Sequence, residues 1–348
     1  MYTLRKFVLM ICAVLLLLAG CGQPGATPAD QASAAPTPAE TPAATPEAAP
    51  EPAHTLTVEI ESEAVADNML DEPSAIEMRI HLPPSYYEQP QRRFPVVYFL
   101  HGFGGHPGSI PPALLDINMP DNEFIVVEPS GHNSLGGSFY VNSPVTGRWE
   151  DFVTKEVIAY IDSTYRTIAD RGGRGIAGFS MGAYSAVNLA LKHPDLYSCM
   201  MAYGPGLIRA GHLQDAFPTW NNSFMNAYGA AFSPNLEGEA PYANIPQFDG
   251  TAADQQIIDD WMSGFGDIEE KIDAYIAAGQ PLAAIKIVVG ANEAYPWILD
   301  GSRAFAECME EKGLDMTLVE FPGGHTIPFA TIQEDFVDYF ADNLVREP

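Results

Sequence analysis

Basic residues are scarce in this chain of 348 residues, in which 17 Lys and Arg stand against 45 Asp and Glu. The formal net charge is −28 at pH 7. So acidic a surface repels DNA, RNA and anionic lipid headgroups, and we therefore expect no nucleic acid partner. The charge has two interpretations. It gives a well-solvated surface, or it reflects adaptation to salt or selection for a neutral or cationic substrate; composition alone favours the first.

Cysteine is also scarce, with four in the chain. No Cys/His spacing resembles a zinc site, so we expect no metal, and no motif implies a cofactor. Cys199 falls on a predicted strand and Cys308 on a predicted helix. We expect two buried free thiols there rather than a disulfide.

The apolar run at the N-terminus, from Phe7 to Gly20, is shorter than the ~20 residues that span a bilayer. Arg5 and Lys6 precede it, as in an export signal. The run ends in LAGC at residues 18–21, which resembles the lipobox of bacterial lipoproteins. That resemblance implies that residues 1–20 are a signal peptide and that Cys21 is lipidated. It places the protein in the cell envelope, anchored to a bacterial membrane through Cys21.

Residues 21–54 are dominated by Ala, Pro, Thr and Glu. Such a segment lacks the large apolar side chains that offset ordering entropy, so we predict a disordered tether that begins at the lipidated Cys21. The remaining residues, 55–348, suit one large domain better than two small ones.

Strand and helix patterns alternate through residues 55–348. Continuous apolar runs are typical of strands buried on both faces of a parallel sheet. Alternation with helices predicts a mostly parallel central sheet covered on both faces. An insertion over residues 205–281, between strands near 198–203 and 285–289, reads as a lid or binding surface with one good helix around Ile257 to Ile276. The other expected helices cover Glu150 to Tyr165, Ala183 to Lys192, Ser302 to Lys312 and Thr331 to Leu344.

Ser180 lies in the motif Gly178-Phe179-Ser180-Met181-Gly182, between a predicted strand and a helix rich in small residues. A G-x-S-x-G motif in that context places its serine on a cramped turn, with the hydroxyl raised above the sheet. Side chains two positions before and after the serine would collide, so glycine is needed there. We predict that Ser180 is a nucleophile.

A serine hydroxyl needs a base, and His325 stands just past the last predicted strand, after Phe321-Pro322-Gly323-Gly324. The imidazole needs a carboxylate in turn. Glu293 follows the strand Ile285 to Val289 and is our candidate, while Asp300 is its rival but looks more like the N-terminal end of a helix.

Attack of a serine on a carbonyl carbon gives a tetrahedral intermediate, whose oxyanion needs two backbone N–H donors. Met181 directly follows the nucleophile and supplies one. The second is expected from Phe103, because the glycine-rich segment His101 to Gly105 follows the strand Pro95 to Leu100. We expect His101 to brace that turn rather than perform chemistry.

Four segments together resemble the putative-esterase (esterase D-like) family of the α/β-hydrolase superfamily: FPVVYFLHGFGGHPGS, RWEDFVTKEVIAYIDSTYR, GIAGFSMGAYSAVNLALKHPDLY and FPGGH. The resemblance covers about residues 75–345 and implies the α/β-hydrolase fold with Ser180, Glu293 and His325 in that order. The group includes feruloyl and acetylxylan esterases, S-formylglutathione hydrolases, enterochelin esterases and mycolyltransferases. It usually has aspartate where Glu293 stands, and often Asp-Trp after the histidine, where this chain has Thr326 and Ile327.

These residues predict a serine carboxylic-ester hydrolase that acts through an acyl-enzyme without metal or cofactor. The expected substrate is a feruloyl or acetyl ester of a carbohydrate, or a small aryl or alkyl ester, free or linked to polysaccharide. Two alternatives stay open: an acyltransferase to a sugar acceptor, and a non-catalytic lipoprotein that binds a ligand. Trp149, Trp220, Trp261 and Trp297 fit either a pocket lining or core packing.

Overall fold

The computed structural model describes residues 53–109 and 123–346, apart from the side chains of residues 332–334. The predictions for the signal peptide, Cys21 and the tether up to residue 52 lie outside these residues. His54, assigned above to the tether, instead pairs with the domain, because its carbonyl accepts a hydrogen bond from Leu82 N–H at 2.8 Å. No helix within the described ranges has both the length and the apolarity to cross a bilayer.

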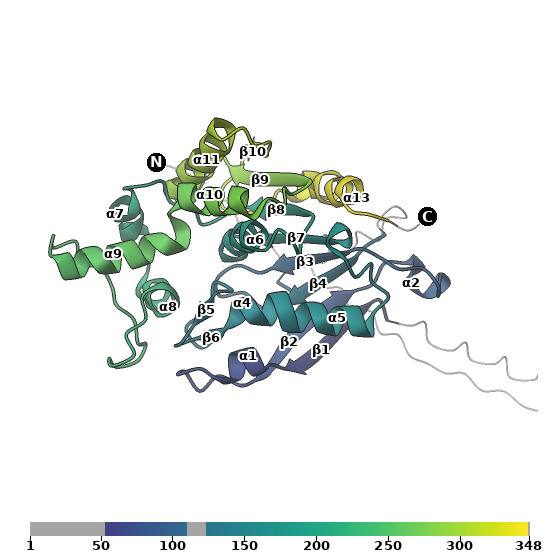
Figure 1. The fold of residues 1–348 in the computed structure, drawn as a ribbon, viewed down its shortest axis with the longest axis horizontal. Coiled ribbons are helices and arrows are strands. Elements are labelled where there is room, and N and C mark those ends of the chain that lie inside the picture. The colour runs from purple at the N-terminus through teal and green to yellow at the C-terminus, as the bar shows by residue number, and fades with distance from the viewer. Residues whose placement is uncertain (1–52, 110–122, 347–348) are drawn as a thin grey trace, which may run out of the picture. The chain divides into compact units, whose positions relative to one another are not determined.

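An eight-stranded sheet forms the centre of the domain, in the order β1-β2-β4-β3-β7-β8-β9-β10 (Figure 1). β2 is antiparallel to both neighbours, and every pairing from β4 to β10 is parallel. The order reverses between β3 and β7, and the carboxyl ends of strands at such a point commonly hold a ligand site. The strands are β1 Thr55–Glu61, β2 Ala75–His81, β3 Val96–Leu100, β4 Ile125–Pro129, β7 Arg174–Phe179, β8 Cys199–Tyr203, β9 Ala284–Gly290 and β10 Thr317–Phe321.

Helices cover both faces of the sheet, as predicted (Figure 1). From β4 to β10, alternate residues of the strands enter different cores, whereas β1 and β2 contribute to the larger core alone. Tyr98 belongs to the larger core, together with residues of α5, α6, α10 and α11, whereas Phe99 packs against Phe336 and shares the smaller core with Phe340 near the C-terminus. The helices of the larger core, with the short α4 and π turn η1 before α5, are α4 Trp149–Asp151, η1 Phe152–Val157, α5 Ile158–Thr164, α6 Met181–Lys192, α10 Ile268–Ala278 and α11 Pro296–Glu311. On the C-terminal side are α12 Phe329–Ile332, η4 Gln333–Val337 and α13 Asp338–Asn343.

Short elements complete the domain. A two-stranded hairpin, β5 with β6, stands apart from the main sheet, and single-turn helices join the strands. These elements are α1 Glu63–Ala66, α2 Ser85–Glu88, β5 Asn142–Ser143, β6 Gly147–Arg148 and η2 Arg171–Gly173.

The segment between β8 and β9 holds more helices than the single one expected around Ile257 to Ile276. α7, α8 and α9 lie together at one end of the sheet (Figure 1). The expected helix is broken at Gly266 and Asp267, where Asp267 takes a left-handed φ of 48°. Lys271 closes this corner by donating a hydrogen bond to Ser263 O at 2.8 Å. Because α10 packs on α6, it belongs to the layer that covers the sheet. The insertion itself comprises α7 Leu213–Ala216, η3 Phe217–Thr219, α8 Asn222–Phe232 and α9 Ala252–Phe265.

The helix expected from Ser302 begins six residues earlier, at Pro296. Proline suits the first turn of a helix, where its missing N–H costs nothing. Asp300 therefore lies inside α11, on an exposed face, rather than at the helix start. Both cysteines are free, but only Cys199 is buried; Cys308, on α11, is partly exposed, contrary to the prediction.

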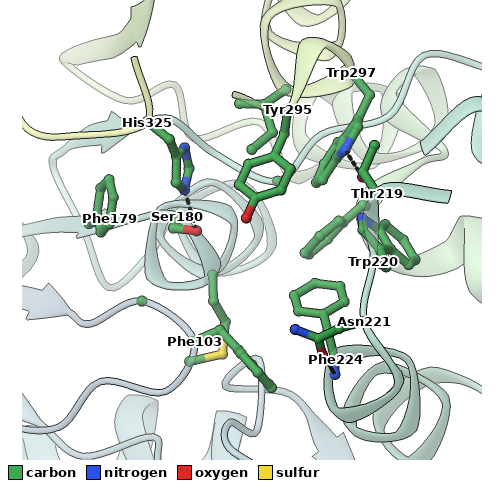
Figure 2. A pocket seen from close by; sticks show the side chains of 15 residues that line it. Phe103, Phe179, Ser180, Thr219, Trp220, Asn221, Phe224, Tyr295, Trp297 and His325 are labelled. Carbon is green, nitrogen blue, oxygen red and sulfur yellow. Dashed lines mark hydrogen bonds between the residues drawn. The ribbon is translucent and has the colours of Figure 1, made fainter. Parts of the chain in front are cut away.

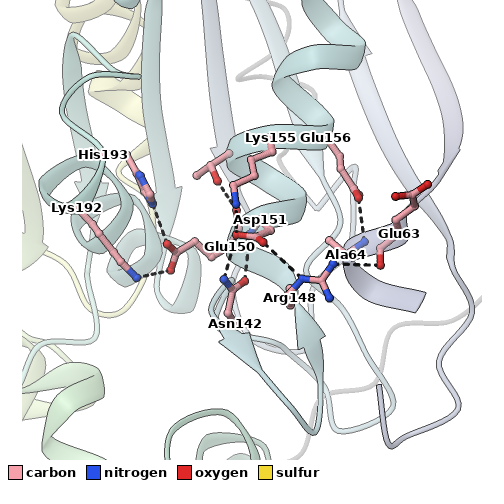
Figure 3. A network of polar contacts seen from close by, with 11 residues as sticks. Glu63, Ala64, Asn142, Arg148, Glu150, Asp151, Lys155, Glu156, Lys192 and His193 are labelled. Carbon is pink, nitrogen blue, oxygen red and sulfur yellow. Dashed lines mark hydrogen bonds and ion pairs between the residues drawn. The ribbon is translucent and has the colours of Figure 1, made fainter. Parts of the chain in front are cut away.

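A polar network ties α6 to the helical segment that follows the β5–β6 hairpin (Figure 3). Glu150 accepts hydrogen bonds at 2.8 Å from both Lys192 and His193. Burial would raise the pKa of Glu150, but these two bonds hold it below its ordinary value. Nearby, Asp151 pairs with Lys155 at 3.0 Å. His193 therefore has a structural partner at the end of α6.

Candidate active site

Ser180 stands at the sharp turn between β7 and α6, with φ 55° and ψ −114°. A non-glycine residue with positive φ is strained, and such strain concentrates at functional sites. The flanking glycines are sterically required. A Cβ on Gly178 would lie 2.2 Å from Gly182 O, and a Cβ on Gly182 would lie 2.0 Å from Leu100 O. The cramped turn expected from the motif is present.

His325 lies beside Ser180, with its Nε2 2.8 Å from Ser180 Oγ. Glu293 lies on the other side of the ring, with Oε1 3.0 Å from His325 Nδ1. The Glu293 side chain is 1% exposed and that of His325 is 16% exposed. The Nδ1–Oε1 contact is short but poorly aligned for a hydrogen bond, and neither Glu293 oxygen accepts one from another described residue. The structure thus brings together all three side chains predicted for the triad.

Two neighbouring loops create this meeting. β9 and β10 are adjacent parallel strands, so their carboxyl ends lie together. Asn292 N–H donates to Gly323 O at 2.8 Å, which joins the loop before Glu293 to the loop before His325. A Cβ on Gly290 would lie 2.4 Å from Gly324 O, so the two loops pack backbone against backbone. The strand register and the close packing at Gly290 together place Glu293 beside His325.

The rival acid and two other histidines lie elsewhere. Asp300 is exposed on α11 and lines a different hollow, beside Arg303. His81 is buried against Glu128 at 2.6 Å, and His212 pairs with Asp215 at 2.9 Å. Neither of these histidines lines the hollow at Ser180.

The turn after β3 approaches the serine. A Cβ on Gly102 would lie 3.4 Å from Ser180 Cβ. No described residue accepts a hydrogen bond from Phe103 N–H, and Met181 N–H, at the start of α6, has no partner within its helix. The two N–H groups predicted for the oxyanion therefore lie on segments next to Ser180.

His101 fixes this turn from behind. Its Nδ1–H donates to Gly102 O at 2.9 Å, and its Nε2 accepts from Gly131 N–H at 2.9 Å. This pattern requires the neutral ring. Burial lowers the pKa of His101 to about 4, which keeps the ring neutral at ordinary pH.

A cavity of about 230 Å³ opens at Ser180 (Figure 2). Aromatic side chains dominate its walls, and none of its described lining residues is Asp, Glu, Lys or Arg. Trp297 Nε1 donates to Thr219 Oγ1 at 2.9 Å, which holds the insertion against α11. The aromatic walls are Phe103, Phe179, Trp220, Phe224, Phe265, Tyr295 and Trp297.

A family model described as putative esterase matches residues 72–338. The chain belongs to the putative esterase family. This confirms the family expected from the four sequence segments. Among the described residues of this family member, no cluster of three or more His, Cys, Asp or Glu could hold a metal ion.

Relatives of this putative esterase agree with the family and the fold. An esterase of Mycobacterium tuberculosis is 28% identical over 256 residues, which cover 70% of this chain and 51% of the relative. The chain thus spans about half the length of the curated relatives that it matches. A ferulic acid esterase superposes with a TM-score of 0.56 at 20% identity, covering 83% of this chain and 95% of its own. An S-formylglutathione hydrolase from Agrobacterium tumefaciens gives a TM-score of 0.54 at 17% identity, covering 84% and 95%. These likenesses confirm the α/β-hydrolase fold.

Sequence reasoning missed several pocket residues of this putative esterase. Of the four tryptophans, Trp220 and Trp297 line the cavity, whereas Trp149 and Trp261 are core residues. Tyr295 is not among the site residues predicted from the sequence. The signal for it was present, since Pro296 marks a helix start and so places Tyr295 on the loop that carries Glu293.

Proposed function

We propose that this chain is a carboxylic-ester hydrolase in which Ser180 is the nucleophile. The observation that carries the proposal is the 2.8 Å contact between Ser180 Oγ and His325 Nε2, made at a strained turn that opens into a pocket. A hydroxyl in that position can lose its proton to the imidazole as it attacks a carbonyl carbon. Family membership and the fold support the assignment.

In the proposed reaction, Ser180 Oγ bonds to the ester carbonyl carbon while His325 Nε2 takes the proton. Met181 and Phe103 N–H groups stabilise the oxyanion, and Glu293 stabilises the imidazolium. The imidazolium then protonates the leaving alcohol as the C–O bond breaks. Water, deprotonated by His325, attacks the acyl-enzyme and releases the acid and free Ser180.

The lining of the pocket supports a neutral ester with an aromatic or small acyl group. A charged acyl group would lose its hydration there without meeting an opposite charge. Feruloyl or acetyl esters of carbohydrates, and small aryl or alkyl esters, fit this description; one structural neighbour is a ferulic acid esterase.

A fluorophosphonate probe tests the nucleophile directly. We expect stoichiometric labelling of the wild type, with hydrolysis of 4-nitrophenyl acetate and methyl ferulate. Both should disappear in Ser180→Ala and persist in the control Ser163→Ala, whose side chain is exposed. An unlabelled, inactive wild type would refute the proposal and favour a ligand-binding role. Product analysis with added sugar separates hydrolysis from transfer.

We also propose that the protein is exported and lipid-anchored at Cys21, on the strength of the LAGC segment at residues 18–21. Incorporation of labelled fatty acid by cells that express the full chain tests this. The wild type should take up the label and Cys21→Ala should not. Absence of label from the wild type would rule out the anchor.

A further inference from the structure

Tyr295 differs from every other residue of the pocket. The residue is 37% exposed, and it is the one exposed large apolar residue among the described residues that line the cavity. Exposed aromatic rings at a cavity mouth commonly serve recognition, because a ligand covers the apolar face while the polar tip stays in contact with water or the ligand. This residue therefore has surface available for a ligand.

The ring of Tyr295 is held in place by its neighbours. It lies edge-on to the His325 ring, with centroids 5.4 Å apart and planes at 88°, and its centroid is 6.3 Å from that of Trp297. The residue immediately precedes α11, two positions after Glu293, on the short loop between β9 and α11. The loop that carries the carboxylate therefore also carries this ring.

The hydroxyl of Tyr295 makes no hydrogen bond to a described residue, whereas buried Tyr228 bonds to both Trp261 and Phe265. Figure 2 shows the Tyr295 hydroxyl pointing into the pocket, on the side of Ser180. A donor and acceptor that points into a cavity without a protein partner is available to a ligand.

The direction of proton transfer places Tyr295 beside the alcohol part of the substrate. On the proposed function, His325 must give its proton to the oxygen of the leaving alcohol, so that alcohol lies on the imidazole side of Ser180. Tyr295 flanks that imidazole and faces solvent, whereas Trp220 and Phe265 line the cavity as buried residues. The acyl group would then lie among the buried rings and the alcohol against Tyr295.

We propose that Tyr295 is a specificity-determining residue that holds a sugar as the alcohol part of the ester. A sugar ring combines an apolar C–H face with hydroxyl groups, and this matches an exposed aromatic face that ends in a free hydroxyl. The inference rests on the proposed function, because it takes the direction of proton transfer from that mechanism.

The test compares two esters of the same acid, methyl ferulate and feruloylated arabinose, in wild type, Tyr295→Phe and Tyr295→Ala. Loss of one hydrogen bond in Tyr295→Phe should raise KM for the sugar ester about 3- to 10-fold. Loss of the ring as well, in Tyr295→Ala, should raise it about 10- to 50-fold. KM for the methyl ester should change less than about 3-fold. Tyr87→Ala, a tyrosine of similar exposure that does not line this pocket, should change neither.

Equal losses on both esters would overturn the inference, because they would show that Tyr295 only supports His325. A change in preference among methyl esters of different acids would also overturn it, by placing the ring against the acyl group. In both cases the wild type remains active and the proposed function stands. A wild type that hydrolyses neither ester, and is not labelled by fluorophosphonate, would instead remove the proposed function and this inference with it.

Discussion

Replacing Glu293 with Gln should separate catalysis from stability in this protein. The carboxylate oxygen is 3.0 Å from His325 Nδ1, and the Glu293 side chain is 1% exposed. With an effective dielectric constant of about 20, two unit charges at that distance attract by roughly 5 kcal/mol. In the proposed mechanism, that energy appears only when the imidazole becomes charged in the transition state. It corresponds to about four powers of ten in rate.

Partial solvation of His325, which is 16% exposed, screens part of this energy. We therefore expect kcat for methyl ferulate to fall about 10²- to 10⁴-fold in Glu293→Gln, with KM nearly unchanged. Asp300→Asn, which alters an exposed residue of α11, should stay within about 3-fold of wild type. Glu293→Asp keeps the charge but shortens the side chain, so its kcat should lie between those of Glu293→Gln and Asp300→Asn.

Stability should move in the other direction. Neither oxygen of Glu293 accepts a hydrogen bond from a described residue, so burial of this charge is poorly compensated. Thermal unfolding should give a Tm for Glu293→Gln equal to or above that of wild type. Retention of more than a tenth of the activity by Glu293→Gln, or a loss of activity that accompanies a lower Tm, would refute the reasoning.

Two further predictions concern the parts that position Ser180. The pKa of His101 is about 4 in the fold against an ordinary 6.5, so the unfolded chain binds the proton first and stability falls as pH drops from 6.5 towards 4, by roughly 3 kcal/mol. Urea unfolding at pH 7 and pH 4.5 should show that this part of the pH dependence disappears in His101→Gln. If the unfolding free energy of His101→Gln changed with pH as much as that of the wild type, the prediction would be contradicted. Gly182→Ala should abolish fluorophosphonate labelling, because the new Cβ would lie 2.0 Å from Leu100 O, whereas Ala186→Gly on the same helix should cost about 1 kcal/mol and leave labelling intact.

The residues proposed to react could be placed from the sequence because their positions follow from local rules. Ser180 is marked by glycines at two fixed offsets and by the strand and helix around them. Glu293 and His325 each follow a strand of a parallel sheet, and carboxyl ends of adjacent parallel strands meet at one edge. The turn at Phe103 lies near Ser180 because β3 and β7 are also adjacent parallel strands, whose carboxyl ends meet.

The pocket walls could not be predicted in the same way. Trp220 lies between η3 and α8, outside any periodic pattern, so nothing local fixes where it points. Phe224 repeats with Tyr228 and Phe232 at helical spacing on α8, but that pattern does not say against which part of the domain the helix packs. The break between α9 and α10 depends on a left-handed Asp267, a conformation that is uncommon for aspartate although less rare than for most residues. Cys308 was expected to be buried, but its side of α11 is partly exposed.

The net negative charge of the chain should affect the release of a carboxylate product from the pocket. The described pocket lining has no Asp, Glu, Lys or Arg, so it suits a neutral ester, but the proposed hydrolysis would leave a carboxylate there. This product meets no counter-charge in the pocket, lies near buried Glu293, and is repelled by a chain of net charge −28. Salt screens such long-range repulsion, with a Debye length of about 10 Å at 0.1 M and about 3 Å at 1 M. Inhibition by free ferulate should therefore strengthen several-fold as salt is raised, while KM for neutral methyl ferulate stays constant. An inhibition constant that is indifferent to salt would mean that the acidic surface has no part in product release and serves solvation alone.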